Sequence, residues 1–313
     1  MKVTSTGTPP VTQQTVLVCG SLHLDVVVEA SHLPRKDETV TGSSVNYICG
    51  GKGGNQAVAA ALNGARTSFA GCTGDDEFGR KLTAHLLRHN IDYSQLQTIG
   101  GASGMSVAIV DGNGDYGAVI VPGANLKIDS SSIEFPESTG ILLLQNEISE
   151  SVNSELARQA STQNIPVMLN AAPYRSIPAR LKHLIDILVL NRVEAEQYFD
   201  THLTCTTDVT AALKNADSSI SMMFVTLGKD GLVYRDIAGQ IHEKTAFPVT
   251  VSSSPGAGDM FCGALASRII DGVISTEALD YAMAAAAWYV GASLAERSAI
   301  NHEAIQVLLA GKK

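Results

Sequence analysis

A glycine-rich turn that runs into a helical segment is the part of the sequence best suited to chemistry. Residues 254–264 read SPGAGDMFCGA. Glycines let backbone N–H groups converge on an anion, and a helix N-terminus adds roughly half a positive charge. A transferring phosphoryl group would be held at such a turn. Asp259, at the predicted helix start, would then accept the proton of an attacking hydroxyl. The alternative is an ordinary N-cap aspartate.

Two further segments have residues that suit a polyol. Residues 49–56 read CGGKGGNQ, which lacks the GxxxxGK[ST] spacing of a Walker A motif. Their glycines would let the backbone approach hydroxyl groups closely, and the amide of Asn55 offers both donors and an acceptor. A flexible turn capped by Asn55 is the alternative. In the segment 20–25, GSLHLD, Asp25 could accept hydrogen bonds from neighbouring hydroxyls. Without other context, Asp25 would be a turn residue and His23 a surface histidine.

Polar residues also follow two predicted strands. Asn191 to Glu194 come after a strand that ends at Leu190, and Thr226 to Gly231 come after the next strand. Open α/β sheets bind ligands at the carboxyl ends of their strands. Glu194 would act through water on Mg²⁺, which keeps several waters, and the glycines of the second loop would admit a nucleotide. A simple Gly-Lys-Asp-Gly hairpin turn explains that second loop equally well.

The elements that position these residues alternate between strand and helix. Apolar runs at 15–19, 67–70, 141–144, 166–169, 187–190 and 223–227 predict strands, and 56–63 and 78–89 predict helices. This alternation predicts a mostly parallel sheet with helices on both faces. Two β-rich stretches, 26–48 and 106–121, interrupt it and predict a small separate sheet, the second one folding back at the turn 111–114. The segment 259–294 is predicted to be helical.

Composition excludes several classes of function. Hydrophobic residues make up 45% of the 313 residues and charged residues 17%, so we expect one large domain with an insertion and a sizeable core. The net charge of −9 without a Lys/Arg cluster argues against binding to nucleic acid or to a membrane surface. The apolar run 281–295 is too short to cross a bilayer and is predicted to be a buried helix. Residues 1–14 are predicted to be a disordered tail. Five cysteines without CxxC pairing indicate reduced, largely buried thiols of a cytoplasmic protein.

Taken together and in this order, these segments resemble the ribokinase-like (PfkB) family of carbohydrate kinases, from about Val16 to the last helix. Residues 50–61 are similar to the first family signature, and residues 255–263 are similar to the second. Within the family the motifs are closest to the ribokinase group. That likeness rests on the segments 20–25, 38–42, 71–76 and 122–125.

The resemblance implies a Rossmann-like three-layer α/β sandwich with a small β-sheet lid, formed by insertions at about 26–49 and 105–122. It implies ATP-dependent phosphorylation of a small sugar such as ribose, with ATP and Mg²⁺ as cofactors, and a homodimer that associates through the lid. Asp259 would be the catalytic base, and the amides of Gly256, Ala257 and Gly258 would form the anion hole. The residues implied to face the sugar are Asp25, His23, Gly51, Lys52, Asn55 and Glu147. Those implied on the nucleotide side are Asn191, Thr226, Gly228 and Gly231, with Glu194 for the metal.

The chain departs from the family pattern at two sites. His23 stands where ribokinases usually have an asparagine that binds the sugar, so the preferred substrate is predicted to differ from ribose. Ser253 and Ser254 replace the Asp-Thr pair of the family's monovalent-cation site, and Leu294 stands near the position of a glycine of that site. Because a cation needs oxygen ligands, ideally with a carboxylate, we predict a weakened dependence on K⁺. The alternative is that backbone carbonyls still bind K⁺.

Two other functional classes fit less well. A dinucleotide-dependent oxidoreductase needs a GxGxxG turn directly after the first strand, and this strand is followed by Gly20-Ser21-Leu22-His23. A sugar- or nucleoside-binding regulator with a kinase fold and little turnover would retain the fold without its chemistry. The intact Gly256 to Asp259 segment argues against that interpretation.

Overall fold

The computed structural model describes residues 14–112, 115–269, 274–293, 295–300 and 302–311. Their largest unit is a nine-stranded sheet of order β13-β12-β11-β10-β9-β8-β1-β4-β5. Its strands are β1 (Thr15–Cys19), β4 (Arg66–Gly74), β5 (Asp92–Ile99), β8 (Thr139–Gln145), β9 (Val167–Asn170), β10 (Ile187–Asn191), β11 (Met222–Thr226), β12 (Leu232–Arg235) and β13 (Ile241–Lys244). Neighbouring strands are parallel except at the β11-β12-β13 edge, which is antiparallel.

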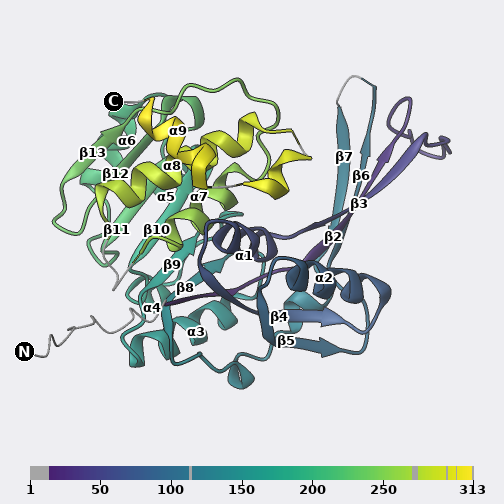
Figure 1. Cartoon of the computed structure of the whole chain (residues 1–313), viewed down its shortest axis with the longest axis horizontal. Helices are drawn as coiled ribbons and strands as arrows, with labels where there is room; N and C mark the ends of the chain where they lie inside the picture. The colour runs from purple at the N-terminus through teal and green to yellow at the C-terminus, as the bar shows by residue number, and fades with distance from the viewer. Residues whose placement is uncertain (1–13, 113–114, 270–273, 294, 301, 312–313) are drawn as a thin grey trace, which may run out of the picture.

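Helices cover both faces of this sheet, as Figure 1 shows. The alternation of β1 directs Val16 and Val18 into one core and Leu17 and Cys19 into the other. Helices α1 (Lys52–Leu62), α2 (Glu77–Arg88), α7 (Ala257–Ala266), α8 (Thr276–Gly291) and α9 (His302–Ala310) pack on the first face. Helices α3 (Glu150–Thr162), α4 (Ala179–Lys182), α5 (Arg192–Phe199) and α6 (Thr206–Lys214) pack on the second. The predicted three-layer α/β fold is confirmed.

A separate four-stranded sheet of order β3-β2-β6-β7 projects from the main body (Figure 1), and we refer to the sheet that was predicted as a lid by that name below. Its strands are β2 (His23–Glu29), β3 (Ser44–Gly50), β6 (Met105–Val110) and β7 (Tyr116–Val121). The register aligns Tyr47, Val26, Val107 and Val119 in one row across all four strands. Residues opposite one another in register share a face, so this row lies on one side of the lid.

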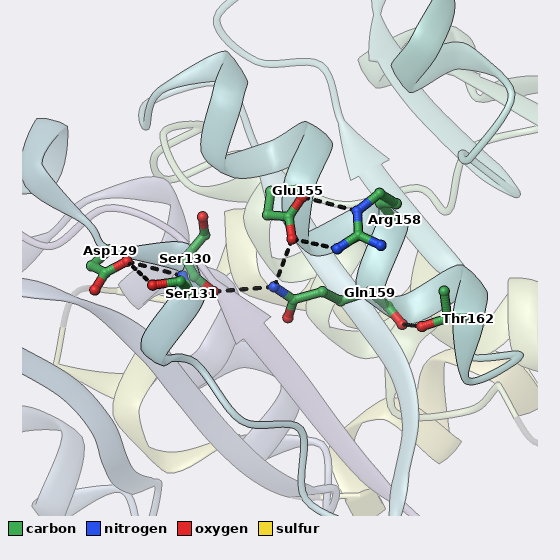
Figure 2. Close-up of polar contacts among 7 residues, drawn as sticks. All are labelled: Asp129, Ser130, Ser131, Glu155, Arg158, Gln159 and Thr162. Carbon is green, nitrogen blue, oxygen red and sulfur yellow. Dashed lines mark hydrogen bonds and ion pairs between the residues drawn. The ribbon is translucent and has the colours of Figure 1, made fainter.

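Polar contacts join helix α3 to a neighbouring segment of the chain, as Figure 2 shows. Gln159 Nε2 donates to the carbonyl oxygen of Ser130 at 3.2 Å and to Glu155 at 3.1 Å. Glu155 also accepts from Arg158 at 2.7 Å on this solvent-facing side. These contacts join α3 to the short 3-10 segment Ser130–Ser132, whose N-cap Asp129 accepts from Ser131.

Several predicted elements have different bounds in the structure. Helix α1 begins at Lys52, so Gly53 and Gly54 lie inside a helix rather than in a loop before it. The segment predicted as continuously helical from 259 contains two helices, α7 and α8. The antiparallel pair β12-β13 was absent from the sequence prediction. The tail residues 1–13, the turn residues 113–114 and Leu294 lie outside the described residues. In the part of the chain that is described, no helix has the length and hydropathy needed to cross a membrane.

Candidate active site

The carboxylate of Asp259 is held by a helix that precedes it by two hundred residues. Helix α7 has Gly256 as N-cap, which makes Asp259 its third residue rather than its cap. One carboxylate oxygen accepts from Gln56 Nε2 at 2.9 Å, and the other accepts from Asn55 Nδ2 at 3.2 Å. The N-cap alternative for Asp259 is therefore wrong, because its carboxylate oxygens accept hydrogen bonds from side chains of α1 and not from the first backbone amides of α7. Gly263 permits this close packing, since a Cβ there would lie 2.5 Å from Ala59 Cβ.

Asp259 is 7% exposed, and its surroundings act on its charge in opposite directions. Burial raises the pKa of this carboxyl, while the positive charge of Lys52 and the amide donors of Gln56 and Asn55 lower it. Glu147 raises it slightly further. A buried carboxylate with raised pKa and oriented donors has the properties of a general base that operates in a site shielded from water.

The turn before α7 presents backbone amides to an anion. Gly256 has φ of 83°, a left-handed conformation that favours glycine, and a Cβ there would lie 2.9 Å from the hydroxyl of Tyr289. Within the described part of the chain, the amides of Gly256 and Gly258 donate to no protein acceptor. The amide of Ala257, in contrast, donates to Ser254 at 3.2 Å. Two of the three predicted anion-hole amides are thus free in this conformation, and the third serves the turn.

The first turn of α1 packs directly on the loop between β1 and β2. Gly51, its N-cap, has φ of 87°, and a Cβ on Gly53 would lie 2.7 Å from Gly20. The backbone amide of Lys52 donates to Glu147 Oε2 at 2.8 Å, and the Ser21 hydroxyl donates to the same oxygen at 2.5 Å. The glycines of this signature therefore serve close packing rather than loop flexibility, which corrects the expected loop. Glu147 is half-buried and joins β1 to α1.

The predicted sugar side lies where the lid meets the main sheet. Asp25 on β2 accepts from the Ser106 hydroxyl on β6 at 2.5 Å, and Gly50 leaves room for it, since a Cβ there would lie 2.5 Å from Asp25 Oδ2. Burial raises the pKa of Asp25, while the Ser106 hydrogen bond and the charge of His23 lower it and Glu147 raises it. His23 is 5% exposed rather than on the surface, and its buried Nε2 has no hydrogen-bond partner among the described residues. This nitrogen is available to a ligand.

Sequence reasoning missed three polar residues that hold this site together. Gln56 Oε1 accepts from Gln145 Nε2 at 2.9 Å, and both side chains are fully buried. Gln145 thus orients Gln56, which in turn donates to Asp259. Asn125 accepts from the Leu22 amide at 2.9 Å and donates to the Leu22 carbonyl at 2.9 Å, which fixes the chain between β1 and β2. Gln56 and Gln145 stand at the borders of apolar runs, where polar residues are common, so the sequence contained no clear signal for them. Asn125 lay in a segment that the family likeness had already marked.

A cavity of about 530 Å³ adjoins the anion turn on the other side from the lid. Its lining includes Thr226 at the end of β11 and Gly228 and Gly231 after it, together with Ala257 and Gly258. Gly231 has φ of 91°, and a Cβ there would lie 2.1 Å from the Lys244 carbonyl, so only glycine fits at this turn. The wall opposite these residues is apolar, with Phe261 and Met283 among its members. The cavity is suited to a planar base with its phosphates directed to the anion turn.

Asn191 and Glu194 form the capping box of α5, and Asn191 is aligned in register with Thr226, which lines this cavity. Glu194 Oε2 accepts from the Asn191 amide at 2.8 Å, and Asn191 Oδ1 accepts from the Glu194 amide at 2.9 Å. Burial raises the pKa of Glu194, and Lys52 is among the groups that lower it. Lys52 thus acts electrostatically on both Glu194 and Asp259. Among the described residues no group of three or more His, Cys, Asp or Glu could hold a metal ion by itself.

Comparisons with known proteins agree with this arrangement. The ribokinase of Bacillus subtilis is 32% identical over 275 residues, which cover 87% of this chain and 91% of the relative. The ribokinase of Haemophilus influenzae is 31% identical over 285 residues, covering 88% and 92%. The solved structure of Arabidopsis thaliana ribokinase complexed with ribose and ATP is similar to this structure with a TM-score of 0.87. It is 28% identical, and the match covers 95% of this chain and 98% of that one.

A family model for pfkB family carbohydrate kinases matches residues 13–301, which include both lid insertions and the base. Neither the oxidoreductase nor the regulator alternative is favoured by these relatives. Given the match over most of its length, the chain belongs to the pfkB family of carbohydrate kinases.

Proposed function

We propose that the protein transfers the γ-phosphoryl group of ATP to a hydroxyl of a small sugar. The observation that carries this proposal is the position of Asp259, a buried carboxylate between the free amides of the anion turn and the glycine-rich start of α1. The similar structure of Arabidopsis thaliana ribokinase is a complex with ribose and ATP, which supports a sugar and a nucleotide as the two ligands.

Each element of the site has a role in this transfer. Asp259 removes the proton of the sugar hydroxyl as its oxygen attacks the γ-phosphorus, and the amides of Gly256 and Gly258 hold the oxygens of the transferring group. The charge of Lys52 offsets the negative charge that accumulates there. Asn55 and Gln56 orient the carboxylate, so that proton transfer requires no rotation of the base.

Mg²⁺ fits this donor set as a metal bound mainly by nucleotide phosphates. The oxygen atoms of Glu194 suit it, and Mg²⁺ commonly keeps several waters and needs only one or two carboxylates. When bound, it would neutralise phosphate charge. Glu194 would hold such an ion through water, because one of its oxygens already accepts from Asn191.

The sugar would bind between the lid and α1. Asp25 offers one carboxylate oxygen beside the one used by Ser106, and His23 offers an unpartnered Nε2. Gly51 and Asn55 would complete the contacts at the helix start. An imidazole in place of an amide has a different shape and a single polar atom per edge, so we propose a preferred sugar other than ribose.

A coupled assay of ADP formation tests the proposal directly. Free pentoses, hexoses, polyols and nucleosides would be supplied in turn with ATP and Mg²⁺, and the phosphorylated product identified by mass. We expect sugar-dependent ADP formation that disappears when Mg²⁺ is chelated. ATP turnover that no sugar stimulates would contradict the assignment.

We propose further that two copies associate through the lid. The face that contains Tyr47, Val26, Val107 and Val119 also contains Leu24, Val28, Val45, Cys49, Met105, Ile109 and Val121, so it is apolar throughout. Exposed apolar patches of this kind mark association surfaces. Val119 is 66% exposed on this face, and its neighbour Ile120 is 59% exposed on the other.

Substitutions at two adjacent positions of β7 test the two faces of the lid sheet independently. Val119→Glu would place a charge in the proposed interface and shift sedimentation from dimer to monomer, whereas Ile120→Glu would leave the dimer intact. A monomeric wild-type protein, or equal effects of the two variants, would contradict the lid dimer.

The thiols bear on where the protein works. All five cysteines are free, and Cys19, Cys72 and Cys262 are buried. Burial raises the pKa of Cys19 to about 12. Thiols persist in this form in a reducing compartment, and we propose that the protein acts in the cytoplasm.

A further inference from the structure

A buried arginine lies directly behind the anion turn. Arg297, in the 3-10 segment Glu296–Ala299 after α8, is 8% exposed. Its Nη2 donates to the carbonyl of Ser253, and its Nη1 donates to the carbonyl of Pro255 at 3.3 Å. Its guanidinium carbon lies 4.2 Å from the ring centroid of Tyr289. The two carbonyls belong to the residues that lead into Gly256.

The partners of this guanidinium are neutral. No Asp or Glu oxygen in the described part of the chain forms an ion pair with it, and its buried Nε has no partner there. A buried charge requires compensation, which here comes from two carbonyl dipoles and an aromatic face. A bound monovalent ion would likewise be coordinated by converging carbonyl oxygens. In this structure the carbonyls of Ser253 and Pro255 instead accept hydrogen bonds from the charged side chain of Arg297.

We infer that the guanidinium of Arg297 is a built-in cation that replaces a bound monovalent ion beside the anion turn and positions that turn for transfer. The inference rests on the proposed kinase function. It explains how a chain with Ser253, and no carboxylate at that position, keeps a positive charge at the turn. Arginine is suited to this role because it stays protonated when buried and its planar fork engages two oxygens at once.

The geometry of the peptide unit links Arg297 to the free amide. In a trans peptide the C=O and the N–H point in opposite directions. Since the Pro255 carbonyl is directed to Arg297, the Gly256 N–H of the same peptide points away from it, where an anion can accept. Donation to the carbonyl also polarises the N–H. Arg297 is therefore a positioning residue that acts through the Pro255–Gly256 peptide.

Two other contacts fix the turn relative to α8. The amides of Ser252 and Ser253 donate to the Val290 carbonyl at 2.8 and 3.1 Å. Tyr289, one residue earlier, lies against both Arg297 and Gly256. These contacts hold the segment that leads into the turn, but they contain no charge. Arg297 brings a positive charge to the turn through its hydrogen bonds to the Ser253 and Pro255 carbonyls.

Cation dependence of the wild-type enzyme is the first test. Initial rates would be measured at constant ionic strength with K⁺, Na⁺ or tetramethylammonium as the only monovalent cation. We expect equal rates in all three. Several-fold activation by K⁺ would overturn the inference, and this outcome does not depend on any variant folding. Absence of sugar phosphorylation in every salt would instead refute the kinase proposal.

Replacement of Arg297 is the second test. Arg297→Ala should lower kcat by about 10- to 100-fold, with little change in the KM for sugar. This is less than the roughly 100- to 1,000-fold loss that follows removal of an oxyanion donor itself, because Arg297 acts on the donor through the Pro255–Gly256 peptide. Millimolar guanidinium or K⁺ should restore part of that loss, because the vacated carbonyls can again bind a cation. Arg297→Lys should retain more activity than Arg297→Ala, since it keeps the charge and loses only the fork.

Arg235 provides a matched control. It is 7% exposed and donates to the carbonyls of Ala216, Asp217 and Ile220, in the loop between α6 and β11. Arg235→Ala should lose thermal stability without any rescue of kcat by guanidinium. The inference fails if Arg297→Ala has the wild-type kcat, or if it is folded and binds nucleotide but gains nothing from either cation.

Discussion

Removing the amide of Gln56 should move the pH dependence of the reaction. Gln56 is fully buried and gives Asp259 the shorter of its two amide hydrogen bonds, at 2.9 Å. In Gln56→Leu the carboxylate loses this donor at a site where burial already raises its pKa. The pKa of Asp259 must rise further, because the lost hydrogen bond favoured the charged form.

The size of the effect follows from the contact that is lost. A hydrogen bond to a charged group contributes about 1.5–3 kcal/mol, and each 1.4 kcal/mol is about a tenfold change in an equilibrium. The ionised, active fraction of Asp259 on the acidic limb should therefore fall by roughly 10- to 100-fold. The base acts when ionised, so the acidic limb moves to higher pH. At alkaline pH, where the carboxylate is ionised in both proteins, kcat/KM should approach the wild-type value.

The assay is the profile of kcat/KM against pH for the wild type, Gln56→Leu and Asn63→Leu. Asn63, the C-cap of the same helix, is equally buried, donates to the Ala59 carbonyl and accepts from Tyr281. Among the described residues it forms no hydrogen bond with a carboxylate. Asn63→Leu should lower the melting temperature without displacing the acidic limb of the pH profile. An unchanged limb in Gln56→Leu, or an equal displacement in both variants, would refute the role given to Gln56.

Three further results are expected. Asp259→Asn should lower kcat by ~10²- to 10⁴-fold and retain sugar binding, and turnover above half of wild type would contradict its role as base. Gly256→Ala should lower both the free energy of unfolding and kcat, because the new Cβ would sit at a left-handed φ and clash with Tyr289. The control is Gly239→Ala, which also has a left-handed φ, of 78°, but no neighbour within 4 Å, and it should lose only about 1–2 kcal/mol of stability. His23→Asn should shift preference towards ribose in a substrate screen, and ribose as the best wild-type acceptor with a neutral His23→Asn would count against this.

The periodic part of the sequence predicted the architecture well, because strands buried on both faces have few other arrangements. The apolar runs at 141–144 and 187–190 correspond to β8 and β10, and the two β-rich stretches correspond to the lid strands. The start of α1 was placed four residues late, because glycines read as loop formers. Their role depends on Gly20, which lies against Gly53 only in the folded chain.

The candidate site was predictable in its residue types and less so in its contacts. Asp259 was identified from a local segment, but its orientation depends on Asn55 and Gln56, about two hundred positions earlier. Local spacing contains no information about such partners. Likewise, Ser253 indicated that a carboxylate was missing, whereas the compensating Arg297 lies 44 positions away and gives no local signal.

The pairing of α1 with α7 has a consequence during synthesis. The lid strands, α1 and the whole sugar side are encoded before residue 150, and domains generally fold from the N-terminus as the chain emerges from the ribosome. Asp259 and the anion turn emerge more than one hundred residues later, after all strands of the main sheet have been synthesised. A nascent or truncated chain can thus contain the sugar-binding groups without the base. Such a chain would not hydrolyse or transfer the γ-phosphoryl group of ATP before Asp259 has been synthesised.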